Sequence, residues 1–263
     1  AFGRPMLRGG NIDGDDWADL AFVKYEPVYD RTIVTIIWGR EHLPSRIDAT
    51  YGDDPEELVS VIQIDDWNST LSDWNWTLRN PGVDAGELSV HLLNFDGDEH
   101  DRDDLLVAVN PLGADALPEG EKYTYAYLFT GSTLLANQGQ SLTVADAAIR
   151  FFDIAYHGLV PQFYEWVLGI PFPGKRYPGA AVTVAGDVNG DGLDDLLFAS
   201  PMAGYADAAP IPVPPLGAAF LVPGRSDYDT AIGLLNPDYV KLEMISPSFG
   251  AGVFALGDVN RDG

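Results

Sequence analysis

The sequence predicts an all-β protein built from repeated units of four strands. Two observations support this prediction. An acidic loop recurs along the chain, and an apolar, strand-like segment follows the loop wherever the sequence continues past it. Gly, Asp and Pro residues separate the segments, as they do between strands that are joined by tight turns. We therefore expect sheets rather than helices along the chain.

Composition and charge restrict the class of protein. The chain has 263 residues, of which 46% are apolar, so it is long enough to bury a substantial core. Its net charge of −25 disfavours nucleic acid and anionic membranes as partners, because phosphate groups are bound by Lys and Arg. An acid excess instead suits a protein that binds cations or stays soluble outside cells. The absence of cysteine excludes disulfide scaffolds and thiolate zinc sites. The sequence contains no run of 18 apolar residues, so we expect no segment that inserts into a membrane.

The acidic loop is clearest in GDVNGDGLDDLLFASP, residues 186–201. Oxygen ligands at positions 1, 3, 5, 7 and 9 of a tight loop, with Gly at position 6, are what Ca²⁺ prefers. The candidate ligands here are Asp187, Asn189, Asp191, the main-chain carbonyl of Leu193, and Asp195. An EF-hand would need an acid at position 12 and a helix to follow, but Phe198 occupies position 12 and Pro201 follows closely. We therefore expect a calcium loop that leads into a strand.

The same loop occurs three more times. The further candidate ligands are Asn11, Asp13, Asp15, the carbonyl of Trp17, and Asp19; Asn94, Asp96, Asp98 and Asp104; and Asp258, Asn260 and Asp262. Four loops in phase argue against plain surface turns. Asp16 and Glu99 replace the favourable Gly in the first two loops, so calcium should bind there more weakly. The second loop has two extra residues before Asp104 and offers Asp101 or Asp103 as alternative ligands.

Strand patterns surround every loop. Expected strands cover residues 5–10, 88–93, 181–186 and 252–257 before the loops, and 20–25, 105–110 and 196–201 after them. Third strands ending near a Gly cover 32–40, 123–132 and 217–225, and fourth strands cover 57–64, 147–155 and 240–246. A four-stranded unit cannot bury both of its faces alone, so stacking the units radially as propeller blades is the natural solution. We expect a single region, 1–263, with units at about 1–86, 87–178 and 179–248 and a partial unit at 249–263.

These units resemble FG-GAP repeats, the blades of the integrin α-subunit β-propeller. The resemblance rests on Phe2-Gly3 and Phe249-Gly250, on Gly-Asp at the start of two loops, and on Ala199-Ser200-Pro201 in the slot of the family's Gly-Ala-Pro. It implies an FG-GAP-type β-propeller of four-stranded blades, with Ca²⁺ in the loops on one face and ligands on the opposite face or rim. It also implies an extracellular or cell-surface location.

Three blades and a partial fourth are fewer than the family's usual seven. Two explanations of this low number stay open. Either the chain is a portion of a longer protein, or several chains self-associate and complete one another's propeller, with a filament as the extreme case.

The expected function is that of an extracellular calcium-binding module for adhesion, binding or structure. Its partner would be an extracellular protein or a glycan. A carbohydrate-binding propeller lectin and a subunit of an extracellular filament are the alternatives. No nucleophile elbow, zinc-protease motif or phosphate loop is present, so we expect no enzyme, unless the chain is the non-catalytic part of a secreted lyase or lipase. Asn68 and Asn75 lie in candidate N-glycosylation triplets.

Overall fold

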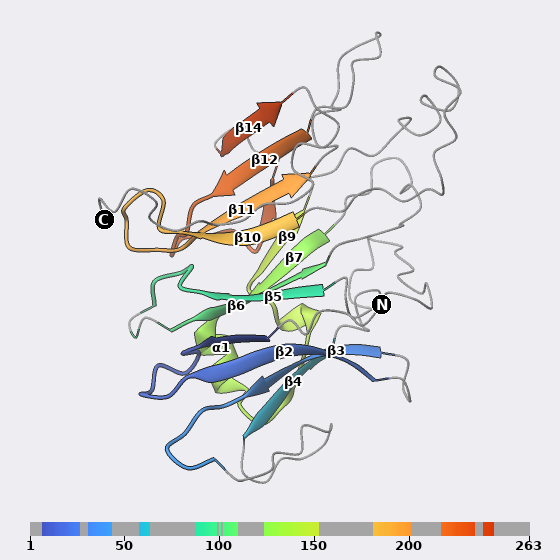
Figure 1. Cartoon of the computed structure of the whole chain (residues 1–263), viewed down its shortest axis with the longest axis vertical. Helices are drawn as coiled ribbons and strands as arrows, with labels where there is room; N and C mark the ends of the chain where they lie inside the picture. The colour runs from blue at the N-terminus through green and yellow to red at the C-terminus, as the bar shows by residue number, and fades with distance from the viewer. Residues whose placement is uncertain are drawn as a thin grey trace.

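The computed structural model describes residues 7–26, 31–43, 58–63, 88–98, 100, 102–109, 124–152, 181–200, 217–234 and 239–244. Within them the protein is almost entirely β-structure, and the strands form three separate sheets stacked one against the next (Figure 1). The all-β prediction is therefore confirmed. The predicted ligands Asp258, Asn260 and Asp262, and the acceptors Asn68 and Asn75, lie outside the described residues.

Each sheet contains the four consecutive antiparallel strands that the sequence predicts. The first sheet holds, in order, β1 (Leu7–Gly10), β2 (Asp19–Glu26), β3 (Arg31–Ile37), β4 (Val59–Gln63) and β8 (Ser141–Thr143). The second holds β5 (Leu88–Leu93), β6 (Asp104–Val109), β7 (Thr124–Phe129), β9 (Ile149–Phe152) and β13 (Ala231–Gly233). The third holds β10 (Ala181–Gly186), β11 (Asp195–Ser200), β12 (Gly217–Val222) and β14 (Val240–Met244). The described sheets are open, and the number of blades stays a prediction.

Two short strands were not predicted, and both join a sheet other than that of their own repeat. β8 follows β7 in the chain, yet it pairs in parallel with β4 of the first sheet. β13 follows β12, yet it pairs in parallel with β9 of the second sheet. The second and third repeats thus each lend a strand to the outer edge of the sheet before them, which covers an otherwise unpaired edge.

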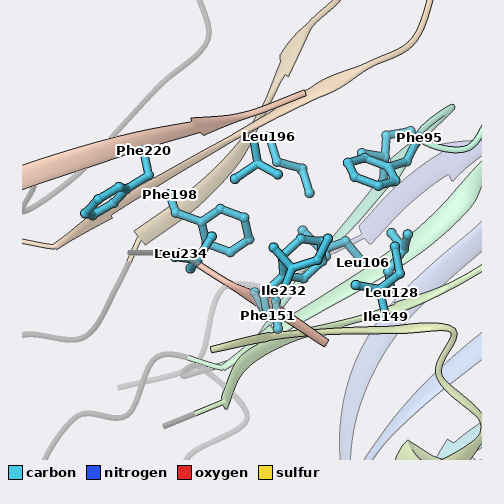
Figure 2. Close-up of a cluster of buried hydrophobic side chains, with 14 of the residues drawn as sticks. Phe95, Leu106, Leu128, Ile149, Phe151, Leu196, Phe198, Phe220, Ile232 and Leu234 are labelled. Carbon is cyan, nitrogen blue, oxygen red and sulfur yellow. The ribbon is translucent and has the colours of Figure 1, made fainter. Parts of the chain in front are cut away.

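The hydrophobic core lies between the sheets. Successive residues of β6 point to opposite faces, as they must in a strand. Leu105 and Val107 are buried against the first sheet together with Ile36, whereas Leu106 is buried against the third sheet together with Phe198. Figure 2 shows the cluster between the second and third sheets, to which β6, β7 and β9 of the second sheet and β11 and β12 of the third contribute side chains. The second sheet therefore buries both faces, as a blade between two others must.

Aromatic rings anchor one acidic loop in this core. Phe95 comes from the loop between β5 and β6, and its ring meets that of Phe151 edge-on, with centroids 6.2 Å apart and planes at 89°. The ring of Phe151 in turn lies 5.1 Å from that of Phe198 in β11. Such pairs add roughly 1 kcal/mol beyond the area that they bury.

A short helix, α1 (Gly131–Ala136), follows β7, and a 3₁₀ turn, η3 (Val144–Asp146), follows β8. Thr130 caps α1, because its side chain accepts a hydrogen bond from the amide of Thr133. The sequence had suggested continued strand up to residue 132. Of the helices that the structure describes, none has the length and apolar character that a membrane span requires.

Candidate metal centres in three acidic loops

The three described acidic loops connect the first two strands of each sheet. We call residues 11–19, 94–104 and 187–195 loops 1, 2 and 3, and we number the positions of each from its first residue. All three loops lie on the same side of the stack, at the left of Figure 1. Because Asp104 begins β6 as Asp19 begins β2, it takes position 9 despite the two extra residues of loop 2.

A glycine at position 4 makes the sharp turn in each loop. Gly14, Gly97 and Gly190 have φ angles of +77°, +62° and +80°, a conformation that favours glycine. The amide of each donates a hydrogen bond to the side-chain oxygen of the residue at position 1, over 2.9, 3.1 and 2.6 Å. The sharp turn expected at position 6 occurs with glycine in loop 3 alone among the described loops, at Gly192, with φ of +91°. The Asn/Asp-x-x-Gly pattern common to the three loops is the sequence signal for the turn at position 4.

Positions 3 and 5 also curl their side chains into the loop. In loop 3 an oxygen of Asn189 accepts from the amide of Asp191, and an oxygen of Asp191 accepts from the amide of Leu193, both over 2.9 Å. In loops 1 and 2 the side chains at positions 3 and 5 likewise each accept a hydrogen bond from the amide two residues further along the chain. The shared geometry shows that the three loops are one structural motif.

The aspartate at position 9 has a different environment. We call Asp19, Asp104 and Asp195 the closing aspartates; their exposed fractions are 0%, 1% and 0%. One carboxylate oxygen accepts the amide of position 2, namely Ile12, Phe95 or Val188, over 2.7, 3.1 and 2.9 Å. The other accepts the amide of a glycine beyond the third strand, namely Gly39, Gly131 or Gly224, over 2.7, 2.9 and 3.0 Å. Each closing aspartate thus ties its loop to the segment that follows the third strand of its sheet.

The three glycines are needed at this join. A Cβ on Gly39 would lie 2.4 Å from the carbonyl oxygen of Ala18, and one on Gly224 would lie 2.7 Å from that of Asp194. A Cβ on Gly131 would lie 2.9 Å from the carbonyl oxygen of Asp103. The Gly that ends each predicted third strand is therefore fixed by close backbone approach.

The carboxylates within one loop repel one another. Burial, and after it the nearby charge of Asp96, raises the pKa of Asp104 to about 7. Burial likewise raises the pKa of Asp19 to about 6. It also raises the pKa of Asp195, to which the charges of Asp191 and Asp187 add. A cation held among these groups would offset both the repulsion and part of the cost of burial.

The donor set fits a hard cation in its chemistry. Every candidate side chain supplies oxygen, and the oxygens alternate along a tight loop. Among the described His, Asp and Glu side chains, however, no three are already gathered as a metal cage. A cation would therefore compete with the loop's own amides for the oxygens at positions 1, 3 and 5.

Loop 2 contains its own positive charge. The guanidinium of Arg102 lies 2.5 Å from Asp98, and both side chains are mostly buried. Burial alone would raise the pKa of Asp98, but hydrogen bonds from the amides of Arg102 and His100, together with the guanidinium, lower it. Arg102 also reaches the carbonyl of Asp13 in loop 1, over 3.4 Å. Because Asp98 already has Arg102 as a partner, loop 2 would gain less from a bound cation than a loop without such a pair.

Asp103 does not serve loop 2 as the sequence analysis had suggested. Its carboxylate accepts the amide of Asn11 over 2.6 Å, and its own amide donates to the carbonyl of Asn11 over 2.8 Å. Asp194 makes the same reciprocal pair with Asn94, over 2.9 and 2.7 Å. We call Asp103 and Asp194 the clasp aspartates, because each joins its repeat to the preceding loop. Asp101, the other alternative ligand, lies outside the described residues.

Of the histidines, His91 is buried in β5 and lies 3.2 Å from the hydroxyl of Ser89. Burial, with the charge of Arg8, lowers its pKa to about 4. It packs in the sheet, as its place in the strand pattern predicts.

Comparison with known proteins bears on this motif. The model of the FG-GAP repeat family matches residues 178–211, which contain β10, loop 3 and β11. No curated protein matches the chain. Residues 178–211 are therefore an FG-GAP repeat, and the resemblance of this chain to the FG-GAP repeat family is confirmed.

Proposed function

We propose that this chain is an extracellular calcium-binding module of a β-propeller and that it serves in adhesion, binding or assembly. FG-GAP repeats occur in extracellular, integrin-like propellers. The observation that carries the proposal is the single geometry shared by loops 1, 2 and 3, in which burial and then the charges of neighbouring carboxylates raise the pKa values of Asp13, Asp96 and Asp195. The partner of such a module would be an extracellular protein or a glycan.

In loop 3 the ion would be held by Asp187, Asn189 and Asp191, with the carbonyl of Leu193 and the closing Asp195. The ion supplies positive charge that neutralises the loop. The chain's own residues hold the loop in shape. Gly190 and Gly192 form its turns, and Asp195 ties it to the end of β12 by accepting the amide of Gly224. Loop 3 has glycine at both turn positions and no arginine paired with its acids in the described structure, so we expect it to bind Ca²⁺ more tightly than loop 2.

The thermal unfolding midpoint tests the proposal. We expect the midpoint to be highest in millimolar Ca²⁺, to fall in EDTA, and to recover less in Mg²⁺ than in Ca²⁺, because a ligand that binds only the folded state stabilises it. A matched concentration of NaCl controls for screening of the acidic surface. Equal midpoints in calcium-loaded and metal-free protein, with the metal content of each sample measured, would contradict a calcium role.

A further inference from the structure

The three loops share one turn but differ in where they place an amide and a carboxylate. Loops 1 and 2 have asparagine at position 1 and aspartate at position 3, whereas loop 3 has Asp187 at position 1 and Asn189 at position 3. In every loop the side chain at position 1 accepts the amide of the glycine at position 4, and the side chain at position 3 accepts the amide of position 5. The exchange therefore puts different chemical groups into the same geometry.

Asn189 supplies an electrophile. Among all the asparagines of the sequence, Asn189 alone precedes a glycine, Gly190. The amide nitrogen that follows an asparagine can attack its side-chain carbonyl carbon and close a five-membered ring, and glycine hinders this attack least because it has no side chain. The side-chain oxygen of Asn189 accepts the amide of Asp191 over 2.9 Å. A donor in that place stabilises the negative charge that develops on the oxygen during the attack.

Asp187 supplies a base. The amide nitrogen of Gly190 donates to Oδ1 of Asp187 over 2.6 Å, within the distance at which a carboxylate can take a proton from the group that it contacts. The amides of Asp191 and Gly192 also donate to this carboxylate, over 3.0 and 2.9 Å, and hold it in place. Loop 3 thus brings together a nucleophile, its base and a polarised carbonyl group.

Loops 1 and 2 have the same turn without this chemistry. Their glycine amides donate to the neutral side-chain amides of Asn11 and Asn94, which are not bases. Position 3 is Asp13 in loop 1 and Asp96 in loop 2, and an ionised carboxylate is a poor target for a nucleophile. Of the three described loops, loop 3 alone therefore combines the base with the reactive amide.

We propose that Asn189 is a site of self-modification, at which loop 3 converts its own asparagine into aspartate or isoaspartate. The nitrogen of Gly190 forms a bond to the side-chain carbonyl carbon of Asn189 while Asp187 takes the proton from that nitrogen. The bond between this carbon and the side-chain nitrogen then breaks, and the leaving nitrogen receives the proton and departs as ammonia. Asn189 and Gly190 are exposed, so one water molecule can open the resulting succinimide at either of its two carbonyl groups. The reaction needs no oxidant or reductant.

The modification would change loop 3 in charge and, for one product, in shape. Each event replaces a neutral amide by a carboxylate, so position 3 gains the group that it already has in loops 1 and 2. In isoaspartate the main chain runs through the former side chain, which lengthens it by one carbon before Gly190. That product should lose the hydrogen bond between Gly190 and Asp187. The inference concerns the chain alone and does not rest on the proposed function.

The rate of amide loss at Asn189 tests the proposal. The metal-free full chain is incubated at neutral pH, folded in buffer or unfolded in urea, and the peptide that contains Asn189 is followed by mass spectrometry and by release of ammonia. We expect Asn189 to react at least about tenfold faster in the folded protein, because a positioned base contributes a factor of about a hundred or more in proton transfer. A folded protein that keeps Asn189 intact, or that reacts no faster than the unfolded chain, would overturn the proposal.

Two matched variants test the base. Asp187→Asn should keep the turn, because Asn11 and Asn94 accept the same glycine amide in loops 1 and 2, and circular dichroism can verify the fold. It removes the base, so the rate at Asn189 should fall at least about tenfold. Asp227→Asn makes the same change at an exposed aspartate outside the loops and should leave the rate as in the wild type. A folded Asp187→Asn variant that reacts as fast as the wild type would contradict the assignment of Asp187.

Discussion

Asp191 and Asp195 are four residues apart in loop 3, and the sequence motif treats both as calcium ligands. In the structure Asp191 is exposed and accepts one amide of its own loop, whereas Asp195 is fully buried and accepts amides from two separate segments. The same residue type in one motif thus serves two purposes. A spacing of acids identifies the loop, but burial tells which acid holds the fold together without any ion.

The largest effect should come from Asp195→Ala. The substitution leaves the amides of Val188 and Gly224 without their acceptor, and an unsatisfied buried amide costs about 1–3 kcal/mol. We expect a loss of about 3 kcal/mol in the free energy of unfolding, in metal-free buffer as well as in calcium. Urea titrations in the two buffers measure it. A loss that appears only with calcium would make Asp195 a ligand and nothing more.

Asp191→Ala should have a smaller effect that depends on the ion. Its one hydrogen bond lies at an exposed turn, so the metal-free protein should lose less than about 1 kcal/mol. In millimolar calcium the loss should grow to about 1–3 kcal/mol, because stabilisation by the ion falls with its affinity. The same titrations report it, with Asp227→Ala, an exposed aspartate outside the loops, as the control. Equal losses in both buffers would remove Asp191 from the ligand set.

The smallest effect concerns pH. The raised pKa values of Asp104 and Asp19, about 7 and 6, mean that the folded protein keeps protons that the unfolded chain releases above about pH 4. The metal-free protein should therefore lose their contribution to stability as pH rises from about 4 to 7. If calcium binds as proposed, it would offset that loss, because it would bind the ionised groups.

The calcium-induced rise in the unfolding midpoint should thus be larger at pH 8 than at pH 5, by about 2–4 °C. His91 changes in the opposite sense: its pKa is lowered, so its contribution grows as pH rises from about 4 to 6.5. That contribution is common to both samples and cancels in the difference. Protein freed of metal by dialysis serves as the reference, since chelators weaken at low pH. A rise of the same size at both pH values would show that the closing aspartates are not coupled to the ion.

The four main strands of each sheet could be predicted from sequence because each has four to eight residues of alternating or continuous apolar character, in a fixed order around a recognisable loop. β11 illustrates this: Asp195 marks its start, and Leu196 and Phe198 point into one interface. The loops were found for a similar reason, since their acids alternate at a fixed spacing. Local pattern and local structure agree in these elements.

What the sequence did not reveal depends on partners distant in the chain. β8 and β13 have three residues each, too few for any period to show, and they form only because β4 and β9 offer an edge. The clasp aspartates look like surplus acids until the stack brings Asp103 beside Asn11, 92 residues away. The helix α1 has six residues, which are too few for a helical period of apolar residues to be recognised in the sequence.

The strands that each repeat lends to the sheet before it also bear on how the protein responds to force. Pulling the first and second sheets apart would have to shear β8 from β4, break the pair between Asp103 and Asn11, and open the core around Ile12. These contacts come from different elements of the same boundary, so we expect tension to be shared among them. A mechanical pull should therefore rupture each boundary in a single step, at a force higher than any one of the three contacts would withstand.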